Sequence, residues 1–236
     1  IYLRRTKLHL GPKIKIILIN ELNMKNDYKI KLMTRMLNHV PDFGWTWEAL
    51  YKAALRPKKN KNPTEEELQI LFDKKVSNII GIFNEQLDEE MYKIHDAKGN
   101  KSLGVTDTIR DLILCRLKAS QNYKSIVKSS LFFMAQPRNA YDALTQLMKT
   151  SDKIWKSAGD SSTGRTFYSK RLILAGVYSS TLAYWLAYET RSIDESEDFL
   201  DRRLDDVKNI GKISKQSIQV FEKTKQELHS LIRKKT

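Results

Sequence analysis

The chain has 236 residues, with 42 Lys and Arg against 28 Asp and Glu, so its formal net charge is +14. Hydrophobic residues make up 41% of the chain and charged residues 30%, which allows a sizeable core and excludes wholesale disorder. Its single cysteine, Cys115, excludes a disulfide scaffold and any metal site built from several thiolates.

The positive charge is concentrated at the two ends of the chain. Residues 1–61 hold fourteen Lys and Arg against four acidic residues, and residues 212–236 hold seven against two. The body between them is therefore close to neutral. An anionic partner, either nucleic acid or an acidic lipid surface, is expected to meet the protein at these ends.

Residues 1–23 are expected to form an unstructured basic extension, with a basic presequence as the alternative. The apolar run Ile16–Ile19 within them is far shorter than the about 20 residues that a membrane-spanning helix needs.

Residues 24–72 have the layout of a helix-turn-helix head, with three short helices in succession. Thr46 is placed to cap the second helix, and Thr64 with Glu67 forms a capping box at the start of the third. A break is expected near Phe72, before a longer helical segment begins.

The basic head makes a DNA-binding, ligand-responsive repressor a real alternative. In that motif, however, the start of the third helix approaches the phosphates of the duplex. Here this start reads Glu65-Glu66-Glu67, and three adjacent carboxylates would be repelled by DNA. We therefore expect a degenerate helix-turn-helix head that binds no nucleic acid.

Residues 73–212 are predicted to form a helical body, because apolar residues recur at helical spacing throughout. Leu172–Tyr188 contains no charged residue and is apolar or small all round. The polar Ser and Thr within it argue against a membrane span, so it is expected at the centre of a bundle or in a subunit interface. An amphipathic helix follows over 194–210. The whole chain has only nine Gly and five Pro, too few for a turn-dense sandwich or barrel. The prediction is therefore an all-α fold.

The sequence offers no constellation for catalysis or for metal binding. Its four histidines are scattered, and the Glu-x-x-His spacing of helical di-iron enzymes is missing. Cys115 lies among Leu112, Ile113 and Leu117, which predicts a buried, inert thiol. We expect neither an enzyme nor a bound metal or cofactor.

The C-terminal segment, residues 213–236, is predicted to be an amphipathic helix. It combines an apolar stripe with a basic face, which is typical of helices that lie on an anionic membrane. An ordinary helix docked on the body is the alternative. The residues expected to contact the membrane are Ile218, Phe221, Leu228, Leu231, Ile232, Lys223 and Lys225.

Several motifs in the second half of the chain stand out together. They are Met134-Ala-Gln-Pro-Arg-Asn139, Asp152-Lys-Ile-Trp-Lys-Ser-Ala-Gly-Asp160-Ser-Ser-Thr163, Tyr168-Ser-Lys-Arg171, Leu174-Ala-Gly-Val-Tyr178, Thr181-Leu-Ala-Tyr-Trp-Leu186, Phe199-Leu-Asp-Arg-Arg203 and Asp206-Val-Lys-Asn-Ile-Gly-Lys212. With these motifs the chain closely resembles one family, the ubiquinone-biosynthesis accessory proteins with a TetR-like fold. Val40–Trp45 and Leu71–Phe72 extend the likeness weakly to the head.

The resemblance implies a non-catalytic TetR-like homodimer that presents quinone intermediates to the demethoxyubiquinone hydroxylase. It implies a peripheral position on the inner membrane, on the cytoplasmic face in a bacterium or the matrix side in a mitochondrion. The docking patch carries over to Asp152, Ile154, Trp155, Phe167 and Tyr168.

The chain departs from the family pattern within this patch. Where the family usually reads Ser-Thr-Asp-Phe-Asn-Trp-Tyr, this chain reads Ser162-Thr-Gly-Arg-Thr-Phe-Tyr168. An acidic position is thus Gly164 and a Trp position is Phe167. Exposed aromatic residues are typical interface anchors, which supports the docking patch independently of the resemblance. The alternative is that Trp155 and Phe167 pack inside the bundle.

The resemblance further implies an internal apolar pocket for an isoprenoid quinone lipid, which would be cargo rather than a cofactor. Burial of a polyprenyl tail contributes about 0.8 kcal/mol per CH₂ group. Each candidate lining residue could instead belong to a filled core. The candidates, all on the middle helices, are Phe83, Leu112, Leu117, Leu131, Phe132, Leu144 and Met148.

Overall fold

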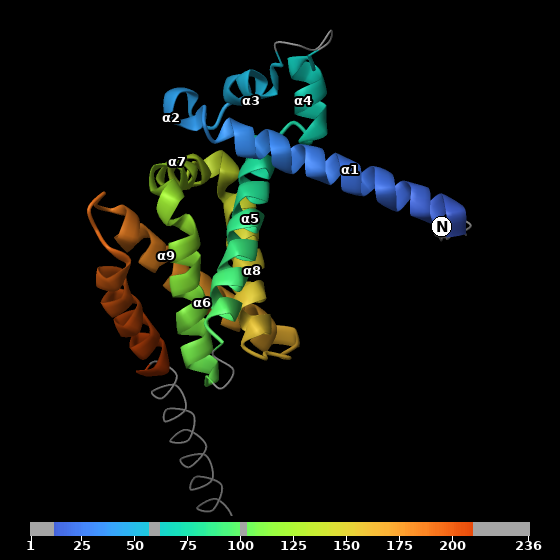
Figure 1. Ribbon diagram of the computed structural model, residues 1–236. Helices are drawn as coiled ribbons and strands as arrows, with labels where there is room; N and C mark the ends of the chain where they lie inside the picture. The colour runs from blue at the N-terminus through green and yellow to red at the C-terminus, as the bar shows by residue number, and fades with distance from the viewer. Residues whose placement is uncertain (1–11, 57–61, 100–102, 210–236) are drawn as a thin grey trace, which may run out of the picture. The chain divides into compact units, whose positions relative to one another are not determined.

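The structure, a computed structural model, describes residues 12–56, 62–99 and 103–209. These residues form helices, turns and loops without a strand, which confirms the predicted all-α class (Figure 1). Residues 193–209 are also helical. The other elements are α1 (Pro12–Met36), α2 (Val40–Phe43), α3 (Trp47–Ala54), α4 (Glu65–Leu71), α5 (Val76–Ala97), α6 (Val105–Ser120), the 3₁₀ turn η1 (Gln121–Tyr123), α7 (Lys124–Met134), the 3₁₀ turn η2 (Pro137–Asn139), α8 (Ala140–Ser157) and α9 (Gly164–Leu186).

The chain divides into two compact units. The first takes the chain up to residue 86 together with residues 125–143, and the second takes residues 87–124 and the chain from residue 144 onward. The predicted head, 24–72, falls within the first unit, which also includes the first half of α5 and nearly all of α7.

The first helix is longer than the sequence pattern indicates. Because α1 begins at Pro12, residues 12–23 are helical, and the expectation of an unstructured extension is wrong for them. Proline is favoured in the first turn of a helix, and neither Gly nor Pro interrupts the chain between Lys13 and Val40. The rest of the predicted extension, residues 1–11, lies outside the described residues.

The short helices of the head begin and end where local chemistry predicts. The Thr46 side chain accepts a hydrogen bond from the amide of Ala49, and Thr64 and Glu67 form the full capping box. The predicted break also occurs, because Asp73 and Lys74 have left-handed backbone angles, with φ of 54° and 57°. This turn separates α4 from α5.

The core of the first unit lies between α1, α3 and α4, which pack against one another in turn. Leu32 and Met36 of α1 are fully buried, as is Leu50 of α3. The ring of Phe83 lies 5.8 Å from that of Trp45. Phe83 therefore belongs to this core, together with the residues of the head.

In the second unit, a buried ion pair joins three helices. Asp88 of α5 accepts a hydrogen bond from Arg116 of α6 at 2.8 Å and another from Thr150 of α8 at 3.1 Å. Lys153 approaches the same carboxylate at 3.1 Å. Breaking a buried pair by removing one partner costs about 3–5 kcal/mol, so this network fixes the relative positions of the three helices within the unit.

Helix α9 has a buried face and an exposed face. Leu174, Tyr178 and Trp185 are buried, whereas Leu172 and Ile173 are about half exposed. Thus the apolar segment 172–188 is not enclosed all round, which excludes the centre-of-bundle expectation and leaves the interface expectation open. Among the described residues, no helix combines the length and apolar character that crossing a membrane requires.

The helix over 193–209 is anchored to α6 in the same unit. The Arg110 side chain of α6 donates hydrogen bonds to Glu197 at 2.6 Å and to Asp201 at 2.5 Å. The ring of Phe199 stacks on that of Tyr184 at the end of α9, with centroids 4.3 Å apart. The predicted amphipathic helix over 194–210 is confirmed for its described part.

Candidate functional site

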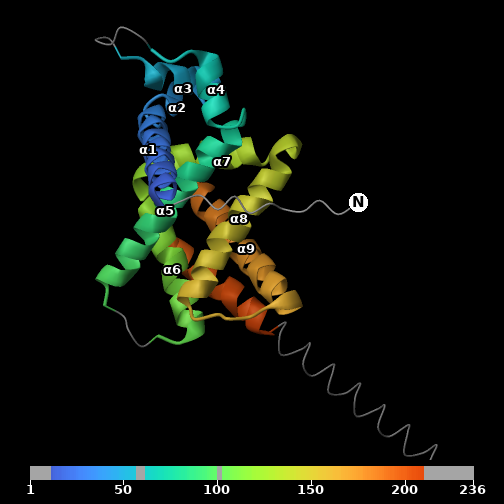
Figure 2. The ribbon, with the colours of Figure 1, turned by 90° about the vertical axis from the view of Figure 1, so that its right-hand side faces the viewer.

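The candidate site lies in the second unit, where α8 ends and α9 begins. The loop 158–163 joins the two helices and brings the last turns of α8 against the first turns of α9 (Figure 2). Two glycines give this connection its shape, since Gly159 and Gly164 have φ of 82° and 61°, angles that other residues rarely adopt. Gly164, which replaces an acidic residue of the family pattern, therefore allows the backbone angle at which α9 begins.

At the centre of the site is Arg171, which is 1% exposed. Its guanidinium donates to Asp152 at 3.0 Å and to Asp160 at 2.7 Å, and its plane lies over the ring of Phe167 at 3.7 Å. Such forked hydrogen bonds to carboxylates are among the stronger ones in proteins. Arg171 thereby joins α8, the loop and α9 into one rigid base.

A second cation completes the charge balance around the loop. Lys170 contacts Asp160 at 2.6 Å, and its ammonium lies 5.1 Å from the centre of the Trp155 ring. Hydrogen bonds from Lys170 and Ser162, with a further one from Arg171, hold the pKa of Asp160 well below its usual range. Asp160 is therefore ionised at all physiological pH values.

The second carboxylate, Asp152, is held in the same way. Burial opposes its ionisation, but hydrogen bonds from Lys156 and Arg171 outweigh this effect and keep the pKa of Asp152 below its ordinary value. Both acidic residues of the base thus carry their charge in the folded protein and are matched by cations.

Three aromatic side chains lie on this base. The indole of Trp155 donates to the backbone carbonyl of Lys170 at 3.0 Å, which fixes the ring. The rings of Phe167 and Tyr168 meet edge to face with centroids 5.2 Å apart. Tyr168 is 62% exposed, so this group presents a fixed aromatic surface to the solvent.

A hollow of about 370 Å³ opens beside the aromatic residues. One wall is Trp155 and another is the loop, with its hydroxyl and backbone groups. The combination of a fixed aromatic ring, a recess and paired charges suits the binding of a protein surface. Its lining residues are Val105, Trp155, Ala158, Gly159, Asp160, Ser161, Ser162 and Lys170.

Four of the five predicted docking residues, Asp152, Trp155, Phe167 and Tyr168, come together at this site. The fifth, Ile154, is fully buried and so lies beneath the surface, where it cannot contact a partner directly. The Ile154 side chain points into the protein, whereas its sequence neighbours Lys153 and Trp155 are partly exposed.

Sequence reasoning missed the residues that hold the site together, namely Asp160, Lys170 and Arg171. They stand inside the motifs that carry the family resemblance, which was the one signal available for them. Their roles depend on pairings across the loop that the sequence does not reveal.

The predicted lipid-binding residues are divided between the two units, and their role stays a prediction. Phe83, Leu131 and Phe132 belong to the first unit, and the other four to the second. Some are buried and others are exposed, and none lines the hollow beside Trp155. The buried members are Phe83, Leu112 and Leu117, the exposed members are Phe132 and Leu144, and the half-buried members are Leu131 and Met148.

The predicted membrane-contact residues, from Ile218 to Ile232, lie outside the described part of the chain. Their role rests on the sequence pattern alone.

Comparisons with known proteins show similarity to one family, and the stretch that matches the family model contains the site. A family model described as COQ9 matches residues 140–211. The chain is 28% identical over 193 residues to the ubiquinone biosynthesis protein COQ9, mitochondrial, of Rattus norvegicus, covering 79% of this chain and 60% of that protein. It is 26% identical to the protein of the same name from Homo sapiens, covering 79% and 59%. The chain thus spans about 60% of the length of these relatives.

A comparison of structures supports the fold independently. A TetR transcriptional regulator from Nitrosomonas europaea superposes with a TM-score of 0.56 at 18% identity, covering 75% of this chain and 96% of the other. The TetR-like fold and the resemblance to the ubiquinone biosynthesis family are therefore confirmed.

Proposed function

We propose that this chain is a non-catalytic accessory protein of ubiquinone biosynthesis. It binds an isoprenoid quinone intermediate and presents it, at a membrane surface, to the demethoxyubiquinone hydroxylase. The relatives that it resembles are named for ubiquinone biosynthesis and for mitochondria, which supports the pathway and favours the matrix side of the inner membrane.

The observation that carries the docking role is the fixed aromatic surface at the start of α9. Trp155, Phe167 and Tyr168 lie within the stretch that the COQ9 family model matches. Aromatic anchors that are already held in place lose little conformational entropy when a partner binds them. Arg171 and its two carboxylates supply this rigidity.

The exposed face of α9 supports a homodimer. Leu172, Ile173, Gly176 and Ala183 are exposed and repeat at helical spacing, so they form an apolar or small stripe. A second copy of the chain would bury this stripe and would complete the enclosure that the sequence predicts for the segment.

The repressor alternative is disfavoured by the surface of α4. Glu65, Glu66 and Glu67 are all exposed at its first turn, where a DNA-reading helix would meet phosphates. The likeness to a TetR regulator concerns the fold and not this surface.

Replacing Tyr168 by Ala tests the docking role. The variant should retain at most about a tenth of the wild-type binding to the hydroxylase, because an exposed aromatic anchor contributes about 2 kcal/mol or more to an interface. The measurement is a quantitative pull-down of the purified hydroxylase, with the helical circular dichroism of the variant checked in parallel.

Tyr188→Ala is the matched control. Tyr188 is 63% exposed, nearly the same as Tyr168, but it lies just beyond the far end of α9, which ends at Leu186. The control should bind as the wild type does. Equal binding by both variants and the wild type would refute the docking surface.

A further inference from the structure

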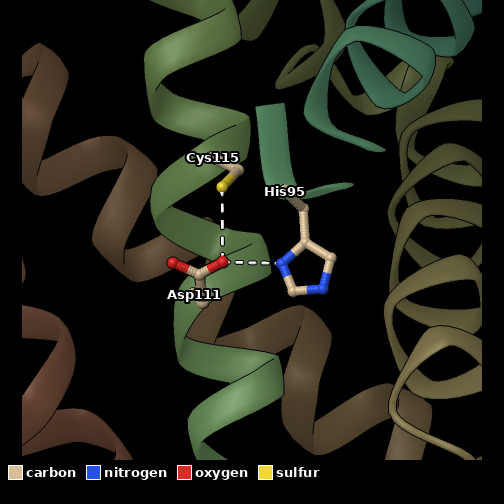
Figure 3. A group of neighbouring side chains, drawn as sticks. All are labelled: His95, Asp111 and Cys115. Carbon is tan, nitrogen blue, oxygen red and sulfur yellow. Dashed lines mark hydrogen bonds and ion pairs between the residues drawn. The ribbon is translucent and has the colours of Figure 1, made fainter. Parts of the chain in front are cut away.

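Outside the candidate docking site, His95 of α5 meets Asp111 and Cys115 of α6. In Figure 2 the chain leaves the end of α5 and returns along α6 in the opposite direction. His95 is in the last turn of α5, whereas Asp111 and Cys115 are four residues apart on α6 and so share one face. Figure 3 shows the three side chains pointing toward one another.

The contacts within this group are short. Nδ1 of His95 lies 2.6 Å from Oδ2 of Asp111, and the Cys115 thiol donates to the same oxygen at 3.6 Å. The nitrogen, oxygen and sulfur atoms all lie within 4.8 Å of one another. One carboxylate oxygen is therefore the common neighbour of an imidazole and a thiol.

From this geometry we infer that His95, Asp111 and Cys115 form a binding site for a zinc ion, with a water molecule as the fourth ligand. Zinc takes nitrogen, oxygen and sulfur ligands at about 2.0–2.3 Å in a tetrahedron, which places the ligand atoms about 3.3–3.8 Å apart. The nitrogen–oxygen separation of 2.6 Å lies below this range and the sulfur–oxygen separation of 3.6 Å lies within it, so side-chain movements of about 1 Å close the site.

The surroundings suit a fourth ligand. The side chains of His95 and Asp111 are 16% and 15% exposed, so the group is shielded but can be reached from the solvent. Cys115 is fully buried, and its burial raises the pKa of the thiol, so zinc must displace a proton to bind the sulfur.

Lys98 is the neighbouring residue that limits the affinity of this site for zinc. Its ammonium donates to Oδ1 of Asp111, the carboxylate oxygen that faces away from His95 and Cys115, and it also interacts with the Cys115 thiol. An outer contact of this kind orients a ligand, but the positive charge also repels a cation. Removal of the charge by Lys98→Met should therefore tighten zinc binding by about tenfold.

Cobalt binding tests the site in the full chain. After treatment with a chelator, titration with Co²⁺ should give a thiolate-to-metal charge-transfer band that saturates at one equivalent and disappears when Zn²⁺ is added. Because the chain has one cysteine, such a band identifies Cys115 as the ligand.

The Cys115→Ser and His95→Gln variants test whether the metal binds at this cluster or elsewhere on the chain. Cys115→Ser should lose the band entirely, and His95→Gln should bind at least about tenfold more weakly. His39→Gln, at a histidine outside the group, should behave as the wild type does. The absence of the band in folded wild-type protein, or affinities unchanged in both cluster variants, would overturn the inference.

Discussion

Arg171 shows how one buried residue organises the candidate site between α8 and α9. Its guanidinium contacts two carboxylates and an aromatic ring, and it comes from a motif, Tyr168-Ser-Lys-Arg171, that draws attention by its family likeness alone. The sequence cannot predict the burial of this charge, because the carboxylates that compensate it lie on α8 and in the loop. The same holds for His95 and Asp111, which are brought together only by the return of the chain along α6.

The carboxylate of Asp160 leads to a prediction on pH dependence. Its pKa is lowered in the folded state, so it stabilises the fold above the ordinary value of about 4, and this contribution is lost as the pH falls through the lowered pKa. The Asp160→Asn variant should therefore have a lower free energy of unfolding than the wild type at pH 7, and the difference should shrink on acidification below about pH 4.

Urea denaturation at a series of pH values measures this difference. Asp194→Asn, at an exposed carboxylate, serves as the control and should stay within about 0.5 kcal/mol of the wild type. A deficit for Asp160→Asn that is the same at pH 3 and pH 7 would contradict the ionic role of Asp160.

At the scale of elements, the starts of short helices were the most predictable features. The caps at Thr46 and Thr64 depend on residues three positions away, so the local sequence specifies them fully. The start of α1 was missed although Ile14, Leu18 and Leu22 recur at helical spacing, because the basic character of this end of the chain favoured an unstructured extension. The face of α9 that is exposed could not be deduced either, since both faces are apolar.

The C-terminal segment 213–236 is the element on which membrane attachment is expected to depend. A chain ending at Lys212 should lose at least about tenfold in binding to anionic vesicles, because each cation near such a surface contributes about 1 kcal/mol. Vesicle flotation measures the bound fraction, and binding by the wild type should weaken as salt is added.

Charge and apolar character can be separated within this segment. The double variant Lys223→Glu and Lys225→Glu keeps the apolar stripe but should bind anionic vesicles more weakly than the wild type does. If the truncated chain floats with anionic vesicles as well as the full chain does, membrane attachment resides elsewhere.

For the whole molecule, the fold class and the family likeness were accessible from the sequence, and the internal arrangement was not. The helical spacing of the apolar residues and the motifs of residues 134–212 lead to an all-α, TetR-like protein, as the structure and comparisons confirm. Which apolar residues line a cavity depends on how the helices pack. Phe83, for example, packs against Trp45 in a way that its sequence neighbours do not reveal.

The claim that the protein carries an isoprenoid lipid is tested most directly by what it retains on purification. Organic extraction of the purified full chain, followed by mass spectrometry, should recover an isoprenoid quinone or its precursor at close to one molecule per chain. The Asp160→Asn variant, changed away from the predicted pocket residues, should retain the same lipid. Recovery of no isoprenoid, or of membrane phospholipids alone, would contradict the account.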